Sequence, residues 1–387
     1  MAASPPHPPA TVNRRCRFAI ISDPHVTLPH TVWNHPARPN LVEVSIPVLE
    51  QIFEHLEAAQ IDFLLMPGDL TQHGERDNHR WLVERLGRLP FPTYVIPGNH
   101  DFPPFGDRPR INQAEFIERY RKFGYQDTGE LPYYNREIFP GIRLIGLNSN
   151  QLSADRKRID GTLDATQRAW LEEQLATHQA DPSDPLLLVM VHHNIAEHIP
   201  HQATHPLGKR YILPEAQALQ QKFRAAGVNA VFTGHLHVQD IVDLDGFHAI
   251  TTGSLISYPH PYRICNCYDV GDRPGDRQRW LEITSHTVRS LPDWPDLETI
   301  SWDWSLEHSR AFMTQLLAKS PLGLSLKDAK YYSREIRSLW ANVSAGDRTL
   351  SFPTLPQAAK DYCEEFGVQL NQSPIRFCAN HIALRLD

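Results

Sequence analysis

The chain has 387 residues, with 38 Lys and Arg against 45 Asp and Glu, which gives a formal net charge of −7. This mild acidity argues against a protein that neutralises a nucleic-acid backbone, and 41% of apolar residues excludes wholesale disorder. At this length we expect one large domain with an appendage, or two domains. Histidine is abundant, with 21 residues, and it is the commonest metal ligand and acid–base group, so the positions of the histidines matter.

The cysteine content and the hydropathy indicate the cellular compartment in which the protein is expected. Five cysteines in a chain of this length do not suggest a disulfide framework, and they favour a reducing, cytoplasmic location. The longest apolar run, at 186–191, is far too short to cross a bilayer, so we expect no membrane span. The proline-rich first residues lack the basic and apolar regions of a secretory signal, and we expect 1–15 to be a disordered tail.

Short apolar runs alternate with segments of helical spacing along the first 290 residues. In chain order, strands are predicted at 18–22, 63–66, 93–96, 142–147, 186–191 and 230–232, and helices at 44–59, 78–89, 113–123, 165–178 and 215–226. Two more strands are expected at 247–252 and 264–270. The strands show almost no alternation, which is typical of strands covered on both faces. The pattern predicts an α/β fold with a largely parallel sheet.

The composition changes near residue 290, and three helices are predicted beyond it, at 306–318, 326–340 and 355–366. We therefore divide the chain into a tail (1–15), a main domain (16–290) and a C-terminal helical extension (291–387). The extension is expected to act as a cap or as the surface of a homodimer.

Five of the predicted strands are followed directly by metal-ligating residue types. The motifs are Asp23-Pro24-His25, Gly68-Asp69, Gly98-Asn99-His100-Asp101, His192-His193-Asn194 and Gly234-His235-Leu236-His237. Ligands bind beyond the carboxyl ends of strands in open α/β sheets, so these segments are expected to converge. Two carboxylates, one amide oxygen and four imidazoles are too many donors for one metal ion and suit two. Oxygen and nitrogen donors without thiolate favour Fe, Mn, Zn or Co over Ca or Mg.

These five motifs, in this order, resemble those of the calcineurin-like metallophosphoesterase superfamily over residues 15–285. The nearest similarity is to bacterial class III cyclic nucleotide phosphodiesterases and related glycerophosphodiesterases. The resemblance implies a four-layer α/β/β/α sandwich of two mixed sheets that holds two metal ions. It implies one metal held by Asp23, His25 and His237, a bridging Asp69, and a second metal held by Asn99, His192 and His235. It also implies that His100 acts as proton donor or transition-state stabiliser, with Asp101 orienting its ring.

Under this resemblance, residues 16–290 form a catalytic domain in which a metal-bridging hydroxide attacks phosphorus in line. A binuclear phosphodiesterase acting on small phosphodiesters such as cyclic nucleotides is the leading hypothesis, with no nucleic-acid polymer as substrate. A phosphomonoesterase acting on a nucleotide, sugar phosphate or phosphoprotein is the alternative, and a non-catalytic scaffold on the same fold is the lesser one. The phosphodiesterase group usually reads His-His-Pro-Pro in the fourth motif, whereas Asn194 follows here, which leaves the shape of that loop open.

Residues that flank the motifs are candidates for the substrate rim. The rim candidates are His193, His198, Tyr258 and Arg263. The segment 27–39, which contains Trp33 and follows the first motif, is a candidate lid. Each of these positions has a simpler interpretation as a loop residue without substrate contact.

Overall fold

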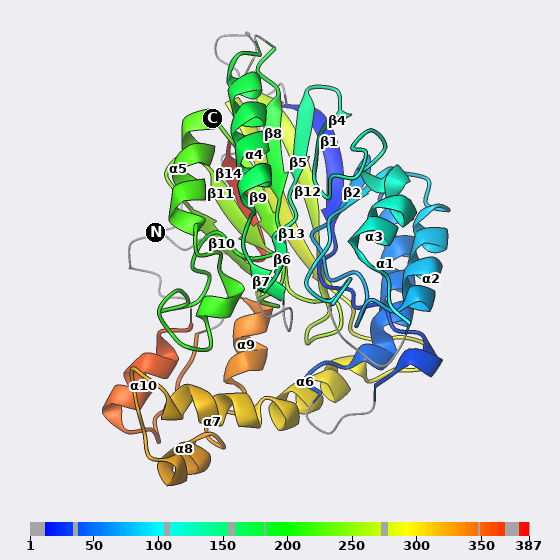
Figure 1. Cartoon of the computed structure of the whole chain (residues 1–387). Coiled ribbons are helices and arrows are strands. Elements are labelled where there is room, and N and C mark those ends of the chain that lie inside the picture. Colours follow the sequence, from blue (N-terminus) through cyan, green and yellow to red (C-terminus); the bar gives the residue numbers. More distant parts are fainter. Residues whose placement is uncertain are drawn as a thin grey trace.

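The structure is a computed structural model. It describes residues 12–33, 38–103, 109–153, 159–181, 183–271, 278–346, 349–367 and 379–386. Two six-stranded mixed sheets pack face to face, and helices cover their outer faces (Figure 1). The strand orders are β14-β13-β12-β1-β2-β3 and β10-β11-β9-β8-β5-β4. This arrangement confirms the predicted α/β/β/α sandwich.

The first sheet combines parallel and antiparallel pairs. Its strands are β1 (Val12–Ile20), β2 (Phe63–Met66), β3 (Thr93–Val95), β12 (Pro261–Val270), β13 (Gln278–Thr287) and β14 (His381–Arg385). The pairs β1–β2 and β2–β3 are parallel, whereas β12, β13 and β14 add antiparallel strands on the other side of β1. The carboxyl ends of β1, β2 and β3 therefore lie at one edge of this sheet.

The second sheet is parallel at its centre. Its strands are β4 (Tyr134–Phe139), β5 (Ile142–Gly146), β8 (Leu186–Met190), β9 (Ala230–Thr233), β10 (Asp240–Asp243) and β11 (His248–Thr251). The strands β5, β8, β9 and β11 run parallel, and β4 and β10 are antiparallel edges. A separate two-stranded sheet joins β6 (Asn150–Leu152) to β7 (Ile159–Gly161).

Helices cover each sheet, as Figure 1 shows, and they contribute buried apolar residues to the cores. The first sheet is flanked by α1 (Ser45–Ala58), α2 (Arg76–Leu86) and α3 (Gln113–Arg119), and the second by α4 (Ala165–Gln179) and α5 (Ala216–Ala226). Between the sheets, the ring of Phe18 on β1 meets that of Phe232 on β9 with centroids 5.8 Å apart. This continuous apolar core fixes the two sheets relative to each other.

The predicted N-terminal boundary is wrong by a few residues. β1 begins at Val12, so residues 12–15 are part of the sheet, paired with β12, and not part of a disordered tail. Basic side chains at Arg14 and Arg15 conceal the strand in the sequence, because they stand at its end, where β1 reaches beyond the apolar core. The rest of the predicted tail, 1–11, lies outside the described residues.

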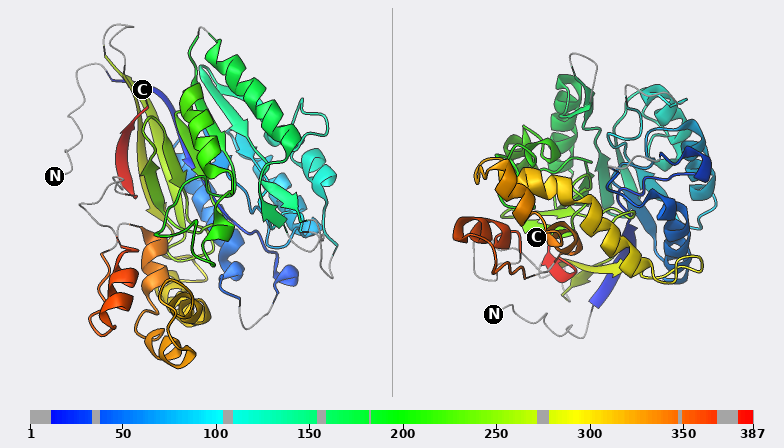
Figure 2. Two further views of the ribbon diagram at one scale, coloured as in Figure 1. Left: turned by 60° about the vertical axis from the view of Figure 1, so that its left-hand side comes forward. Right: turned by 90° about the horizontal axis from the view of Figure 1, so that it is seen from below.

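The C-terminal extension is helical, as predicted, but it does not stay separate from the main domain. Its helices are α6 (Leu297–His308), α7 (Arg310–Ala318), α8 (Leu326–Tyr332), α9 (Leu339–Ala345) and α10 (Gln357–Glu364), which lie beneath both sheets in Figures 1 and 2. The predicted helix 326–340 is divided into α8 and α9, and the buried Ser333 at the break donates its hydroxyl to the carbonyl of Lys330. The chain then returns to the first sheet as β14, so the proposed boundary at 290 does not separate independent units.

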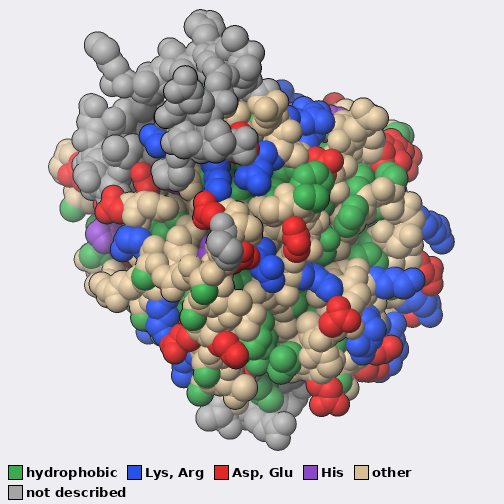
Figure 3. All heavy atoms as spheres, turned by 90° about the horizontal axis from the view of Figure 1, so that it is seen from above, with side chains coloured by type: hydrophobic (Ala, Val, Ile, Leu, Met, Phe, Trp, Pro, Cys, Tyr) green, Lys and Arg blue, Asp and Glu red, His purple; other side chains and the backbone are tan. Residues whose placement is uncertain are grey.

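The end of the molecule opposite the C-terminal helices carries Lys, Arg, Asp and Glu side chains intermixed over the coloured surface (Figure 3). No helix of the described residues is long and apolar enough to cross a membrane.

Candidate metal centre

The seven predicted metal ligands all lie beyond the carboxyl ends of strands from both sheets. Asp23 and His25 follow β1, Asp69 follows β2, Asn99 follows β3, His192 follows β8, and His235 and His237 follow β9. Because the two sheets face each other and these five strands end at the same side of the sandwich, the side chains meet where the sheets come together.

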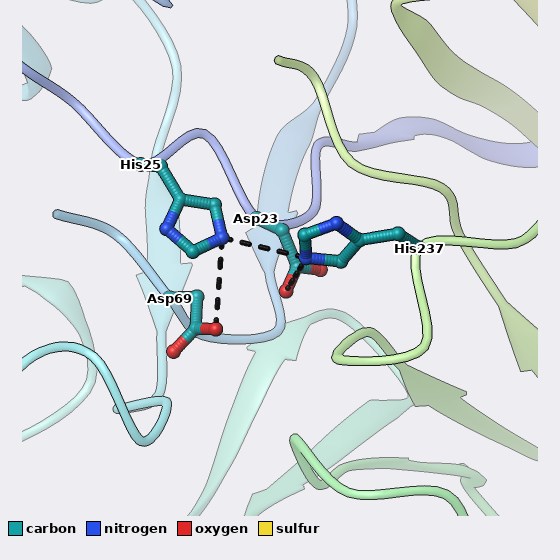
Figure 4. Close-up of side chains that lie close together, drawn as sticks. All are labelled: Asp23, His25, Asp69 and His237. Carbon is teal, nitrogen blue, oxygen red and sulfur yellow. Dashed lines mark hydrogen bonds and ion pairs between the residues drawn. The ribbon is translucent and has the colours of Figure 1, made fainter. Parts of the chain in front are cut away.

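Four of these residues form a first group, shown in Figure 4. Asp23, His25, Asp69 and His237 each offer one donor atom, and these atoms lie within 4.8 Å of one another. The Nε2 atoms of His25 and His237 are 3.4 Å apart. The Nε2 of His25 is 3.7 Å from Oδ2 of Asp69, and that of His237 is 3.4 Å from Oδ1 of Asp23. The donors therefore face a common point.

A second group shares Asp69 with the first. Donor atoms of Asp69, His192 and His235 also lie within 4.8 Å of one another. The Nε2 of His192 is 3.3 Å from Oδ2 of Asp69 and 3.2 Å from Oδ1 of Asn99. The same carboxylate oxygen of Asp69 thus faces a histidine of each group, which is a placement that suits a ligand shared by two ions.

The backbone around the centre adopts conformations that residues other than glycine rarely take. Positive φ angles of 48°, 42°, 48°, 66° and 61° occur at Asp23, His25, Asp69, His235 and His237. Each such residue costs on the order of 1–3 kcal/mol, and these conformations concentrate at functional sites. Position 98 requires glycine because its backbone lies close to that of Asp69. A Cβ atom on Gly98 would stand 2.2 Å from the backbone nitrogen of Asp69.

Charge and burial shift the pKa values of several of these groups. Burial would raise the pKa of Asp69, but neighbouring His192 and His100 outweigh it and hold that pKa well below its usual range. Burial lowers the pKa of His25 and of His235 well below their usual range. Burial also opposes the charge on His192, yet the Asp69 carboxylate raises its pKa to about 9. A buried carboxylate among mainly neutral imidazoles is a donor set that fits divalent transition metals.

His100 adjoins this centre, but the structure corrects how its ring is held. Its backbone N–H donates to Oδ1 of Asp69 over 2.8 Å, and its ring Nδ1 lies 2.6 Å from the carbonyl oxygen of Gln72. The predicted orientation by Asp101 is wrong. The buried Asp101 carboxylate instead accepts hydrogen bonds from the backbone N–H groups of Leu70, Thr71 and Gly98. Asp101 therefore holds the loops that carry Asp69 and His100.

Three of the four rim candidates lie in the interior. His193 is buried, with Nδ1 2.8 Å from the Ser149 hydroxyl and its ring 4.3 Å from that of His235. His198 is buried with Nδ1 2.9 Å from a carboxylate oxygen of Asp240. A rim position is therefore wrong for both.

Arg263 is also wrong as a rim residue, because it is fully buried and donates to the carbonyl oxygens of Thr251 and Ala379. It thereby joins the main domain to the last segment of the chain. Tyr258 is half-buried, with its ring 5.0 Å from that of Trp302 on α6.

Two further neighbours of the centre come from the loop that follows the fourth motif. Tyr211 places its ring 5.0 Å from that of His235, and the guanidinium of Arg210 lies 4.7 Å from the centre of the Tyr211 ring. The Nε2 of His235 lies 3.3 Å from the backbone carbonyl oxygen of Arg210. Both residues precede α5 at the end of a long loop, and the pairing of Asn194 with Ile212 helps to hold the end of that loop near the site.

His79 lies in the interior, next to Asp101. It is fully buried, with Nε2 2.9 Å from the carbonyl oxygen of Asp101 and Nδ1 2.9 Å from the Tyr120 hydroxyl. Burial lowers the pKa of His79 to about 3, so the ring is neutral. Its position on the apolar side of an amphipathic helical segment was the sequence signal that could have predicted its burial.

The comparison with protein families agrees with this geometry. The model of the calcineurin-like phosphoesterase family matches residues 16–239, more than half of the chain. The chain belongs to this family. The matched segment contains all seven residues of the metal centre together with His100 and Asp101.

Relatives with curated descriptions are similar over parts of the chain. A probable cyclic nucleotide phosphodiesterase of a Synechococcus species is 31% identical over 152 residues, which cover 39% of this chain and 49% of the relative. A probable glycerophosphodiester phosphodiesterase of Arcobacter nitrofigilis is 29% identical over 133 residues, 34% of this chain and 41% of the relative. The matches thus span about half or less of these two relatives. The 3′,5′-cyclic adenosine monophosphate phosphodiesterase of Haemophilus influenzae is 24% identical over 249 residues, 63% of this chain and 77% of the relative.

Among solved structures, a dimetal phosphatase from Danio rerio aligns with a TM-score of 0.52 and 13% identity. The alignment covers 71% of this chain and 97% of that one. At this identity the likeness shows that the two proteins share the fold.

Proposed function

We propose that this protein is a binuclear metal-dependent phosphodiesterase that hydrolyses small phosphodiesters, with cyclic nucleotides as the leading substrate class. The observation that carries the proposal is the position of Asp69, whose Oδ2 faces His25 of one donor group and His192 of the other. The descriptions of the curated relatives support the choice of a diester.

Each protein residue has a defined task in this proposal. Asp23, His25 and His237 would hold one ion, Asn99, His192 and His235 the other, and Asp69 both; Fe, Mn, Zn and Co suit these donors. When bound, the two ions supply Lewis acidity and a water of lowered pKa. The short contact from Gln72 keeps a proton on Nδ1 of His100. A proton on Nε2 would then be the one that the ring could donate to the departing alkoxide.

A comparison of two chromogenic substrates tests the proposal. In Mn²⁺, the purified protein should hydrolyse bis-p-nitrophenyl phosphate faster than p-nitrophenyl phosphate, and a panel of cyclic nucleotides then defines the class. The opposite ratio would favour a phosphomonoesterase. The Asp69→Ala variant serves as the control, because it removes the shared ligand and should lose activity and bound metal together; full turnover by this variant would place the reaction elsewhere.

A further inference from the structure

A row of aromatic rings leads from the metal centre to an exposed indole. Trp33 follows the short 3₁₀ helix η1 (Pro29–Thr31), and 48% of it is exposed to solvent. Its ring stands edge-on to that of His73, with centroids 5.7 Å apart. His73 stacks on His100 at 5.5 Å, and His100 meets His25 at 4.9 Å. Trp33 is thus only one ring removed from the residue proposed to act on the leaving group.

Hydrogen bonds to two buried side chains hold the backbone on both sides of this row. The side-chain oxygen of Asn78 accepts from the backbone N–H of Leu28 and from the hydroxyl of Thr31, each over 3.0 Å. The same Asn78 donates to Glu75, whose Oε2 also accepts from the backbone N–H of His73 over 2.8 Å. Asn78 and Glu75 are both buried. The segment that leads to Trp33 and the turn that carries His73 are therefore anchored to the same point at the start of α2, as a preorganised surface requires.

An exposed indole close to a phosphate-binding site can contact the organic substituent of a bound phosphoester. Since 48% of Trp33 is exposed, the fold does not gain the full free energy that burial of a tryptophan provides. A phosphoester bound at the metal centre would carry its organic substituent next to His100 and hence close to His73 and Trp33. Aromatic side chains in such positions bind the faces of planar groups.

We propose that Trp33, placed against His73, is the stacking surface for a planar substituent of the substrate, a nucleobase or another aromatic ring. This inference rests on the proposed function, since the substituent reaches Trp33 only when its phosphoryl group lies at the metal centre. A flexible alkyl substituent such as glycerol has no π face and gains little from the indole. Trp33 is therefore a residue that distinguishes nucleotide-like from alkyl phosphoesters.

Calorimetric titration of the Mn²⁺-loaded protein with two monoesters, adenosine 5′-monophosphate and glycerol 3-phosphate, separates the stacking contribution from phosphate binding. Trp33→Ala should weaken binding of the adenosine ester about tenfold and change that of the glycerol ester less than about twofold. Trp33→Phe, which keeps a ring, should retain most of the affinity. Tyr331→Ala is the matched control, because Tyr331 is an exposed aromatic residue, 62% exposed, on α8.

The possible results are distinct. Equal weakening of both monoesters by Trp33→Ala, or no change in either, overturns the stacking surface. A wild-type protein that hydrolyses no phosphodiester overturns the proposed function, whereas the two titrations still decide whether Trp33 recognises planar groups. Metal content and circular dichroism of each variant show whether a loss of affinity comes from the ring or from a disturbed fold.

Discussion

At the scale of single residues, Asp101 shows how one carboxylate organises the centre without touching it. Its two oxygens accept hydrogen bonds from three backbone N–H groups, which belong to the loops after β2 and β3. These loops carry Asp69, Asn99 and His100. The adjacent His100, by contrast, has its ring oriented by the Gln72 carbonyl oxygen. Neighbours in the sequence thus make different contacts, and only the ring of His100 adjoins the proposed ligands.

This division predicts different results for substitutions at adjacent positions. Asp101→Asn puts an amide donor against buried N–H groups and should lower the free energy of unfolding by about 2–4 kcal/mol. His100→Ala should leave stability and metal content intact while the rate falls roughly 10²–10⁴-fold. Urea unfolding, metal analysis and kcat measured side by side check both. An Asp101→Asn variant of full stability that loses only activity would restore the ring-orienting role.

His260 makes the stability of the fold depend on pH. It is fully buried, its Nδ1 lies 2.8 Å from the carbonyl oxygen of Leu255, and its Nε2 has no hydrogen-bond partner among the described residues. Burial lowers the pKa of His260 to about 4. The unfolded chain, with an ordinary histidine pKa of about 6.5, takes up the proton first as the pH falls. The contribution of the neutral ring is therefore complete above about pH 6.5 and is lost towards pH 4.

We expect the free energy of unfolding to fall by roughly 3 kcal/mol through His260 between these pH values. The His260→Asn variant cannot titrate there, so its unfolding free energy should depend less steeply on pH over this window, whatever its value at pH 7. Urea unfolding at half-unit steps of pH measures both slopes. Identical slopes in the two proteins would show that His260 does not contribute.

At the scale of elements, the C-terminal helices and the last ligand motif share one apolar core. Leu236, between the ligands His235 and His237, is 1% exposed and packs in the same cluster as residues of α7, α9 and α10. Val238 joins it, and Ile199 and Leu207 bring the loop before α5 into the same cluster. The extension thus supports two of the proposed ligands from below.

The Leu236→Ala variant tests whether this residue supports the ligands in addition to stabilising the core. The cavity should cost about 2–5 kcal/mol, and Mn²⁺ affinity should fall as well, because the backbone that presents both histidines loosens. Leu316→Ala in α7 is the matched control, since Leu316 lies in the same cluster but not beside a ligand. It should lose similar stability with Mn²⁺ affinity unchanged, as unfolding and calorimetric titration will show. Equal losses of affinity in both variants would contradict a specific role for Leu236.

At the scale of the whole molecule, the chain closes on itself. β14 completes the first sheet beside β13, the Asn229 side chain donates to the carbonyl oxygen of Leu386, and Arg263 donates to that of Ala379. The last segment therefore provides partners for buried polar groups of the main domain, which water would otherwise have to supply.

A chain truncated after residue 290 is expected not to fold into a stable monomer. It would expose the edge of β13, leave Arg263 buried with fewer acceptors and uncover the apolar residues around Leu236. Size-exclusion chromatography and circular dichroism of residues 1–290 beside the full chain check this. A soluble monomer with native spectra would support the independent domain that the composition change at 290 suggests.

The sequence alone determined an α/β class, the strands that precede the ligand motifs and the convergence of these motifs, whereas the two-sheet sandwich and the ligand assignments came from the family resemblance. The first three follow from local pattern, because a buried strand needs a run of apolar residues and each ligand motif lies directly after such a run. The strands of basic or mixed sequence were missed in part, as the start of β1 and β14 show, because they lie at a strand end or a sheet edge, where an apolar run is not required.

Only the tertiary structure decided what lies around the centre. The sequence could not show that Gln72 and not Asp101 holds the ring of His100, or that His198 and Arg263 face inward. These contacts join residues that are distant in the sequence, and the paths of the loops bring them together. The same is true of Trp33, which nears His100 through His73 and the anchor at Asn78. Side-chain types are local properties of a sequence, whereas the partner of each side chain depends on how the whole chain folds back.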